Sequence, residues 1–231
     1  NVNSRIWCIA RVLLGLMMLF GSTRQARAQS GIDMTDVRVE YQFGEQINFL
    51  ARIQSPVPIQ NATVTFREPD GPAQTQPLTV NPDGTAGYRY DASLNALAPF
   101  SPIIFWFNVI LVDGTVVESG TYNFTYVDNR FPWQAHEEGM MRVHWYDGDE
   151  AFGAAVLDAA QRGVQSVYNL IPIDVNAPID IWVYSDSVDL QGALVLGGQS
   201  WVAGHASPEL GVVMVSVKPG PEQSIELERQ V

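Results

Sequence analysis

The sequence predicts an export signal, then an all-β sandwich of the immunoglobulin or fibronectin kind, then an α+β segment. Three observations lead to this prediction. Residues 1–28 begin with basic residues, continue with an apolar run and end in A-x-A. In residues 36–128 apolar and polar residues alternate with a period of two, and the residues beyond 131 mix strand and helix patterns. We therefore expect a signal peptide over 1–28, a sandwich domain over 29–130 and an α+β domain over 131–231.

The first 28 residues have the three parts of a secretory signal. Arg5 and Arg11 precede an apolar run over 12–20, and Ala26-Arg27-Ala28 follows it. Nine apolar residues are far fewer than the roughly 20 that a membrane-spanning helix needs, which favours cleavage after Ala28 over a retained anchor. The prediction is an exported protein, secreted or held in the cell envelope, with no membrane span after cleavage.

Composition excludes several functions for the exported part. Cys8 is the only cysteine and precedes the apolar run, so the cleaved chain has no disulfide, no thiolate metal site and no cysteine nucleophile. Residues 1–28 hold four of the 13 basic residues and no acid, so the remainder carries 9 basic against 25 acidic residues, a formal charge of −16. Such a surface repels phosphate backbones, and nucleic acid is therefore not expected as a partner.

Short alternating strands account for residues 36–128. Apolar residues at every second position predict six or seven antiparallel strands, the main ones at 37–41, 47–53, 62–66, 85–90, 103–112 and 115–127. Asp113-Gly114 is a hairpin pair that we expect to join the two longest strands. The continuous apolar run over 103–107 predicts a central strand buried on both faces. This series is typical of an immunoglobulin- or fibronectin-like sandwich.

The pattern changes at 128–133, the predicted domain boundary, and then mixes strand and helix. A strand over 141–146 leads into a helix with Asp147 as its predicted N-cap and Glu150 as the capping-box partner. One face of that helix is apolar, at Phe152, Val156, Ala160, Val164, Val167 and Ile171. Beyond it we expect a strand over 179–184, a short helix over 188–195, strands over 201–206 and 211–217, and a further helix start at 220–222.

The sequence has three histidines that could bind a metal ion or take part in an active site. His136 begins a segment like the H-E-x-x-H zinc motif, but Met140 replaces the second histidine and a strand follows, so we expect a solvated linker there. His144 is expected on the polar face of its strand beside Arg142, exposed or hydrogen-bonded. These residues alone identify no active site and no metal site.

The segment Trp201-Val202-Ala203-Gly204-His205-Ala206 offers the best local sign of a binding surface. Glycine within a strand often marks the close approach of another backbone, and an edge strand can pair with an extended peptide. A structural bulge with a half-exposed histidine is the alternative interpretation of this segment.

Taken in order, residues 141–231 resemble the start of a peptidase MA-like (gluzincin) zinc metallopeptidase domain, which a β-sandwich often precedes in exported bacterial relatives. The resemblance lies in the order of the elements: the strand with Val143-His144-Trp145-Tyr146, the long amphipathic helix, the strand over 178–184, the segment over 201–206, the strand over 211–217 and the acidic segment over 224–231. It implies that Trp201, Ala203, Gly204 and His205 form a substrate-binding edge strand for a peptide or protein substrate.

In that family the next element is the zinc helix with H-E-x-x-H, so the resemblance implies that the catalytic residues and zinc ligands follow Val231. The full-length protein would then hydrolyse peptide bonds with a zinc-activated water, whereas this chain alone would bind no zinc and be inactive. The alternative is a non-enzymatic cell-envelope binding or adhesion module built on the β-sandwich. Exposed aromatic residues on one face of the sandwich would favour that alternative.

Overall fold

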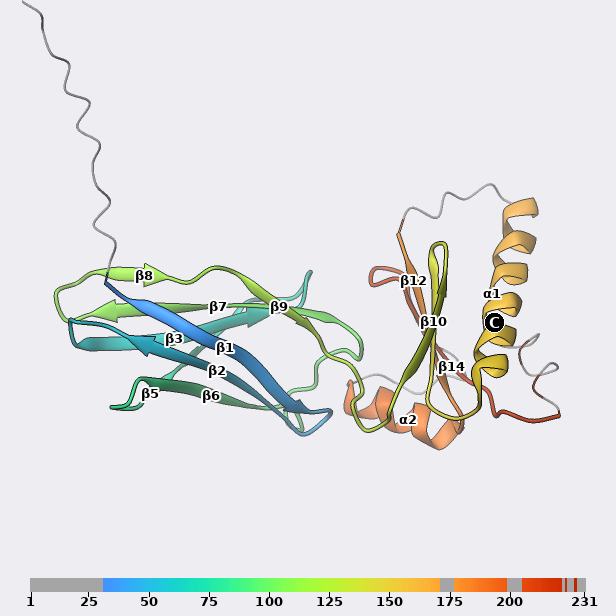
Figure 1. Ribbon diagram of the computed structural model, residues 1–231, viewed down its shortest axis with the longest axis horizontal. Helices are drawn as coiled ribbons and strands as arrows, with labels where there is room; N and C mark the ends of the chain where they lie inside the picture. The colour runs from blue at the N-terminus through green and yellow to red at the C-terminus, as the bar shows by residue number, and fades with distance from the viewer. Residues whose placement is uncertain (1–30, 171–176, 199–204, 222, 224–226, 228–231) are drawn as a thin grey trace, which may run out of the picture. The chain divides into compact units, whose positions relative to one another are not determined.

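The computed structural model describes residues 31–170, 177–198, 205–221, 223 and 227, and its first part is a sandwich of two antiparallel sheets (Figure 1). The β2 sheet has the order β1-β2-β6-β5, with β1 Asp33–Gln42, β2 Gln46–Gln54, β6 Thr85–Asp91 and β5 Thr79–Val80. The β7 sheet has the order β4-β3-β7-β8, with β4 Gln74–Pro77, β3 Ile59–Arg67, β7 Pro102–Leu111 and β8 Val116–Glu118. A further strand, β9 Tyr122–Thr125, also pairs with β7. The predicted sandwich is confirmed.

One face of each sheet is apolar and packs against the other sheet, because the side chains of a strand alternate between its two faces. The buried inward residues of the two central strands are Ile47, Phe49, Ala51 and Ile53 on β2 and Ile103, Phe105, Phe107 and Val109 on β7. The ring of Phe49 lies 4.9 Å from that of Phe66 and 5.2 Å from that of Phe105, measured between centroids. Each such side chain contributes about 1.5–3 kcal/mol when fully buried, which makes this core the main source of stability of the sandwich.

The strand expected over 115–127 is interrupted. β8 has three residues and ends at Glu118, and β9 begins at Tyr122, so the hairpin turn joins β7 to a short strand rather than joining the two longest strands. The turn itself forms as predicted: Gly114 takes a φ of +84°, which favours glycine, and Asp113 Oδ1 accepts a hydrogen bond from Thr115 N at 2.9 Å.

The expectation that the run over 103–107 is buried on both faces is wrong. β7 is central, with β3 on one side and β8 and β9 on the other, but only every second residue of it is buried. Ile104 and Trp106 are half-buried because the sandwich has two layers, and the outward side of β7 belongs to its surface.

The second part is a five-stranded sheet with the order β10-β11-β12-β14-β13 (Figure 1). Its strands are β10 Gln134–Glu138, β11 Met141–Trp145, β12 Ile179–Tyr184, β14 Val212–Ser216 and β13 His205–Ser207. The three central strands are parallel, and the two edge strands, β10 and β13, pair antiparallel with their neighbours. Helix α1, Glu150–Leu170, connects β11 to β12, and α2, Ser187–Leu196, follows β12. The predicted mixture of strands and helices is present in this part.

Each face of this sheet packs against one of the helices. The residues that one sheet face and α1 bury together include Val143, Ile181, Val183, Phe152, Val156 and Ala160. The other sheet face packs against α2, and the buried residues of both belong to the same apolar cluster as the sandwich core. These residues are Trp182, Tyr184 and Met214 of the sheet and Leu190 and Leu194 of α2. The apolar core of the sandwich is therefore continuous with one face of the second sheet.

Helix α1 has a different N-cap from the one predicted. It begins at Glu150, and the carboxylate of Asp149 accepts a hydrogen bond from Phe152 N at 3.0 Å, the contact that an N-cap makes with the third residue of a helix. Asp147 lies two residues too early to reach that N–H group.

The last predicted elements are described only in part. The strand expected over 201–206 is represented by β13, since residues 201–204 lie outside the described residues. Near the helix start expected at 220–222, Gln223 and Leu227 are helical, and Leu227 is buried. None of the helices in the described part of the chain is both long and apolar enough to cross a membrane.

Candidate functional site

The predicted substrate-binding segment is described only at its end. Trp201, Ala203 and Gly204 lie outside the described residues, while the backbone of His205 opens β13 and pairs with Met214 of β14. β13 is an edge strand of its sheet, which is the position that pairing with an extended peptide requires. The role of these four residues in binding substrate stays a prediction.

The other two histidines lie in strands. His136 belongs to β10 and not to a linker, because residues 134–138 pair in full register with β11. Its Nδ1 lies 3.3 Å from Glu150 Oε1. Within the described ranges, no group of three histidine, cysteine or acidic side chains is placed to hold a metal ion.

A charged cluster surrounds Asp180 on β12. Its two carboxylate oxygens accept hydrogen bonds from Arg142 Nη2 at 2.6 Å and from His144 Nε2 at 2.8 Å. Burial acts to raise the pKa of Asp180, but the hydrogen bonds from His144 and Arg142 outweigh it and hold the pKa below the ordinary value. Since both oxygens are engaged, the cluster joins β11 to β12 rather than offering a free carboxylate for proton transfer.

His144 confirms the expectation of a hydrogen-bonded sheet histidine. Its ring stacks on Trp182 with centroids 3.8 Å apart, and the ring of Phe100 from the sandwich stacks on the same indole at 3.9 Å. These rings and the Asp180 cluster line a cavity of about 360 Å³ together with Pro102 and Thr125.

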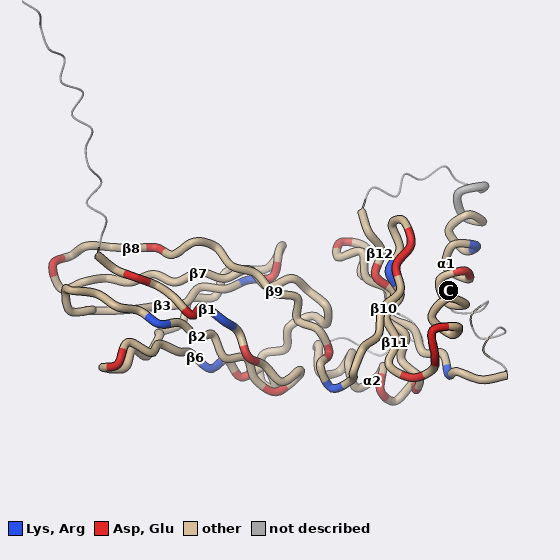
Figure 2. Tube along the Cα trace, viewed as in Figure 1, with Lys and Arg blue, Asp and Glu red and all other residues tan. Residues whose placement is uncertain are grey.

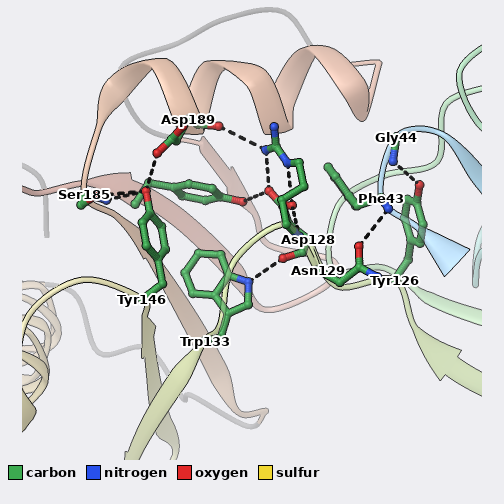
Figure 3. Close-up of polar contacts among 11 residues, drawn as sticks. Phe43, Gly44, Tyr126, Asp128, Asn129, Trp133, Tyr146, Ser185 and Asp189 are labelled. Atoms are coloured by element: carbon green, nitrogen blue, oxygen red, sulfur yellow. Dashed lines mark hydrogen bonds and ion pairs between the residues drawn. The ribbon is translucent and has the colours of Figure 1, made fainter.

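Asp128 follows β9 and is the centre of a buried polar network (Figure 3). Arg130 donates to both of its carboxylate oxygens, at 2.8 and 2.6 Å, and Tyr184 OH donates at 3.0 Å. The carbonyl oxygen of Asp128 accepts from Trp133 Nε1 at 2.7 Å. Burial and the neighbouring Asp128 carboxylate raise the pKa of Tyr184, so its hydroxyl keeps the proton that it donates.

The network extends in both directions from Asp128 (Figure 3). Tyr146 OH donates to Asp189 Oδ2 at 2.7 Å and accepts from Ser185 N at 3.1 Å, and burial raises the pKa of Tyr146 to about 12. On the sandwich side, Asn129 Oδ1 accepts from Phe43 N at 2.9 Å. Because these polar groups bond to one another, the network is a structural junction and not a ligand site.

The outward face of the β7 sheet carries a half-buried tryptophan among hydroxyl and amide side chains. Trp106 lies directly opposite Thr65 of β3, and Thr65 lies opposite Thr75 of β4, with the two threonine hydroxyls 2.9 Å apart. Asn108 is the next outward residue of β7 and lies opposite Thr63. We call the set Trp106, Asn108, Thr63, Thr65 and Thr75 the Trp106 platform.

The side of Trp106 away from Thr65 faces a break in the sheet. Asn108 pairs with Glu118 and Phe105 with Tyr122, so the two intervening residues of β7 face three residues, 119–121. The extra residue separates β8 from β9, and a Cβ added at Gly120 would have no atom of the described residues within 4 Å. Among the described residues, the indole of Trp106 has no ring contact and no hydrogen-bond partner. Trp106 is half-buried, so part of its side chain is accessible to solvent.

Sequence reasoning missed Trp106 as a candidate site residue. Ile103 to Phe107 are all apolar, which hides the alternation of β7, and the first polar residue is Asn108. A period of two counted backwards from Asn108 places Trp106 on the outward face, and this was the signal that could have found it.

The comparisons with known proteins give no family for this chain. No family model matches it, and no curated protein matches it. Among solved structures, a β-1,3-glucan binding domain of carbohydrate-binding module family 56 is similar over 40% of this chain and 98% of its own, with 15% identity and a TM-score of 0.28. BhCBM56 is similar over 38% of this chain and 88% of its own, with 9% identity and a TM-score of 0.31.

A third similar structure is catalytically inactive OgpA from Akkermansia muciniphila in complex with an O-glycopeptide substrate, glycodrosocin. It shares 16% identity over 47% of this chain and 32% of its own length, with a TM-score of 0.32. Each of these three similarities spans less than half of this chain, and none assigns an activity to it.

Proposed function

We propose that this chain is a non-enzymatic binding module of an exported protein and that the Trp106 platform binds a neutral glycan. The observation that carries the proposal is the half-buried indole of Trp106, which has no ring contact or hydrogen-bond partner among the described residues. On the outward sheet face it lies opposite Thr65, with Asn108 and Ile104 on either side of it along β7.

The chemistry of the platform matches that of a sugar ring. A pyranose has a C–H face that packs on an aromatic ring and a rim of hydroxyl groups that both donate and accept hydrogen bonds. The hydroxyls of Thr63 and Thr75 and the amide of Asn108 can do both as well, so they suit hydroxyl groups better than a fixed charge would. Thr65 is buried, and its hydroxyl is bonded to that of Thr75. The Trp106 Nε1 adds a donor beside the stacking surface.

The charge of the chain favours a neutral glycan over an anionic one. Acidic residues outnumber basic residues by 25 to 13 over the whole sequence. β7 itself carries no charged residue, and its trace is uniformly uncharged in Figure 2. An anionic polymer would be repelled by the protein as a whole. The cation in register beside the platform is Arg67 of β3, opposite Ile104, and its guanidinium already donates to the carbonyl oxygens of Glu68 and Pro69.

Affinity electrophoresis in gels that contain a soluble neutral polysaccharide tests the proposal, with a β-glucan, an α-glucan and a mannan as probes. We expect at least one of them to retard the full chain. Trp106→Ala should weaken that binding about tenfold or more, as for an aromatic residue at the centre of an interface, and Trp106→Phe should keep most of it.

Leu50→Ala is the matched control, since Leu50 is a half-buried apolar residue on the outward face of the β2 sheet. It should bind as the wild type does. A wild-type chain that none of the polysaccharides retards would overturn the proposal, and so would equal retardation of the Trp106→Ala and Leu50→Ala variants.

A gluzincin peptidase remains a second candidate for the full-length protein. The order of β11, α1, β12, β13 and β14 follows the order on which the resemblance rests, and β13 lies at an edge of its sheet. The catalytic residues and the zinc would then come from sequence beyond Val231. Sequencing the gene downstream of Val231 tests this candidate, and a downstream sequence without H-E-x-x-H would exclude it.

A further inference from the structure

A cleft of about 660 Å³ lies at one end of the sandwich. Its lining residues come from three segments: 53–55, 57 and 58 at the end of β2 and in the loop that follows, 59–62 at the start of β3, and 78 and 80–84 around β5 and the turn before β6. Its apolar lining comes from the end of the sandwich core, through Ile53, Ala62 and Leu78.

A β-bulge places two amide side chains next to each other in this cleft. Ile59 pairs with Leu111 and Asn61 pairs with Ile110, so Gln60 is an extra residue in β3. Both Gln60 and Asn61 are exposed, whereas Ala62, which follows them, is buried. Bulges commonly re-aim side chains in this way, and here the bulge turns both amides toward the same space.

The polar groups of the cleft suit a neutral ligand with many hydroxyl groups. Gln54, Gln60 and Asn61 each offer two donors and one acceptor. Among the described residues that line the cleft, Asp83 is the charged one, and one of its carboxylate oxygens already accepts hydrogen bonds from Thr85 N at 3.0 Å and Thr85 Oγ1 at 2.7 Å. In the part of the chain that the structure describes, no basic and no aromatic residue lines the cleft, so a ligand there would be held by hydrogen bonds rather than by ion pairs or stacking.

Strand β3 contributes residues both to the cleft and to the Trp106 platform. Asn61 lines the cleft, and Thr63 and Thr65 belong to the platform, with partners on β7 that point outward. Every second residue of a strand lies on the same face, and four residues of strand span about 13 Å. A chain of several sugar units can therefore contact both places at once.

We infer that the cleft is a second subsite for the same glycan, in which Gln60 and Asn61 bind the hydroxyl groups of sugar units beyond the one that stacks on Trp106. This inference rests on the proposed function. It adds that recognition depends on chain length, because short fragments reach the platform only.

Calorimetric titration of the full chain with neutral oligosaccharides, from disaccharide to hexasaccharide, tests the inference. The oligosaccharides derive from the polysaccharide that retards the wild type. Wild-type affinity should rise with length, and the double variant Gln60→Ala/Asn61→Ala should bind the hexasaccharide about tenfold more weakly while binding the disaccharide normally. Trp106→Ala should weaken binding at every length.

Asn95→Ala is the control, because Asn95 is an exposed amide that lies beyond β6 and outside the cleft lining. Thermal melts of all variants establish that each is folded. If the double variant binds the hexasaccharide as tightly as the Asn95→Ala variant does, the cleft is not a subsite. Weaker binding by Trp106→Ala in the same experiment would still support the platform as the binding site. If no oligosaccharide binds the wild type at any length, the proposed function fails, and the cleft fails with it.

Discussion

Asp128→Asn should destabilise the folded chain by about 3 kcal/mol, because it removes the charge at the centre of the junction network without changing the shape of the side chain. Asp128 is fully buried, and its carboxylate accepts from both Arg130 and Tyr184. An asparagine has one acceptor oxygen, and its NH₂ group would face a donor. Breaking a buried ion pair costs about 3–5 kcal/mol, and the lower end applies here because the Arg130 side chain is 33% exposed and can rehydrate.

Urea denaturation at pH 7 measures this change as a shift of the midpoint at an unchanged slope. For a chain of this size, about 3 kcal/mol also corresponds to a fall in melting temperature of roughly 6–12 °C. Asp70→Asn is the control, since Asp70 is an exposed aspartate and its change should lie within about 0.5 kcal/mol of zero. If the Asp128→Asn variant unfolds at the same urea concentration as the Asp70→Asn variant, the network is not a stabilising junction.

Two further changes probe the second sheet. Gly153→Ala should destabilise by about 1–3 kcal/mol in urea titrations, because its Cβ would lie 2.4 Å from the Trp145 ring, whereas Gly120→Ala, which meets open space, should be nearly neutral. Asp180→Asn should lower the free energy of unfolding at pH 7 and lower it less in acid. The hydrogen bonds to Asp180 hold its pKa below the ordinary value, so they stabilise the fold fully above about pH 4. This stabilisation is lost as the pH falls through the pKa that Asp180 has in the folded chain. Urea midpoints at pH 7 and pH 3 measure it, and an equal difference from the wild type at both pH values would contradict the assignment.

The elements that the sequence predicts correctly are those whose burial follows a local period. Along β2, Ile47 to Ile53 alternate cleanly, and along α1 Phe152, Val156 and Ala160 recur at helical spacing, so the pattern alone locates them. β4 and β10 were missed because their sequences are polar: Gln74–Pro77 and Gln134–Glu138 are held by pairing with a neighbouring strand rather than by an apolar face of their own.

The boundary at 128–133 shows why local patterns do not reveal contacts between distant segments. Asp128, Asn129 and Arg130 interrupt the strand pattern and are typical of an exposed linker. In the structure Asp128 is fully buried, and the nearby Phe100 stacks on Trp182 of the second sheet. The partners that bury this segment lie more than 50 residues away, as Tyr184 does, and no window of the sequence contains both.

Trp106 shows the same limit for a candidate site. An apolar residue within an apolar run is most often part of the core, and hydrophobicity does not distinguish an aromatic ring that packs inside from one that faces a ligand. What distinguishes them is the pairing of β7 on both sides, which makes the strand central, and the two-layer sandwich, which leaves its outward face at the surface. Phe105 and Trp106 are neighbours in the sequence, but Phe105 packs against Phe49 in the core and Trp106 lies among threonine and asparagine side chains. A tryptophan in that position contributes little to the core, and this is why we assign it a role in binding rather than in stability.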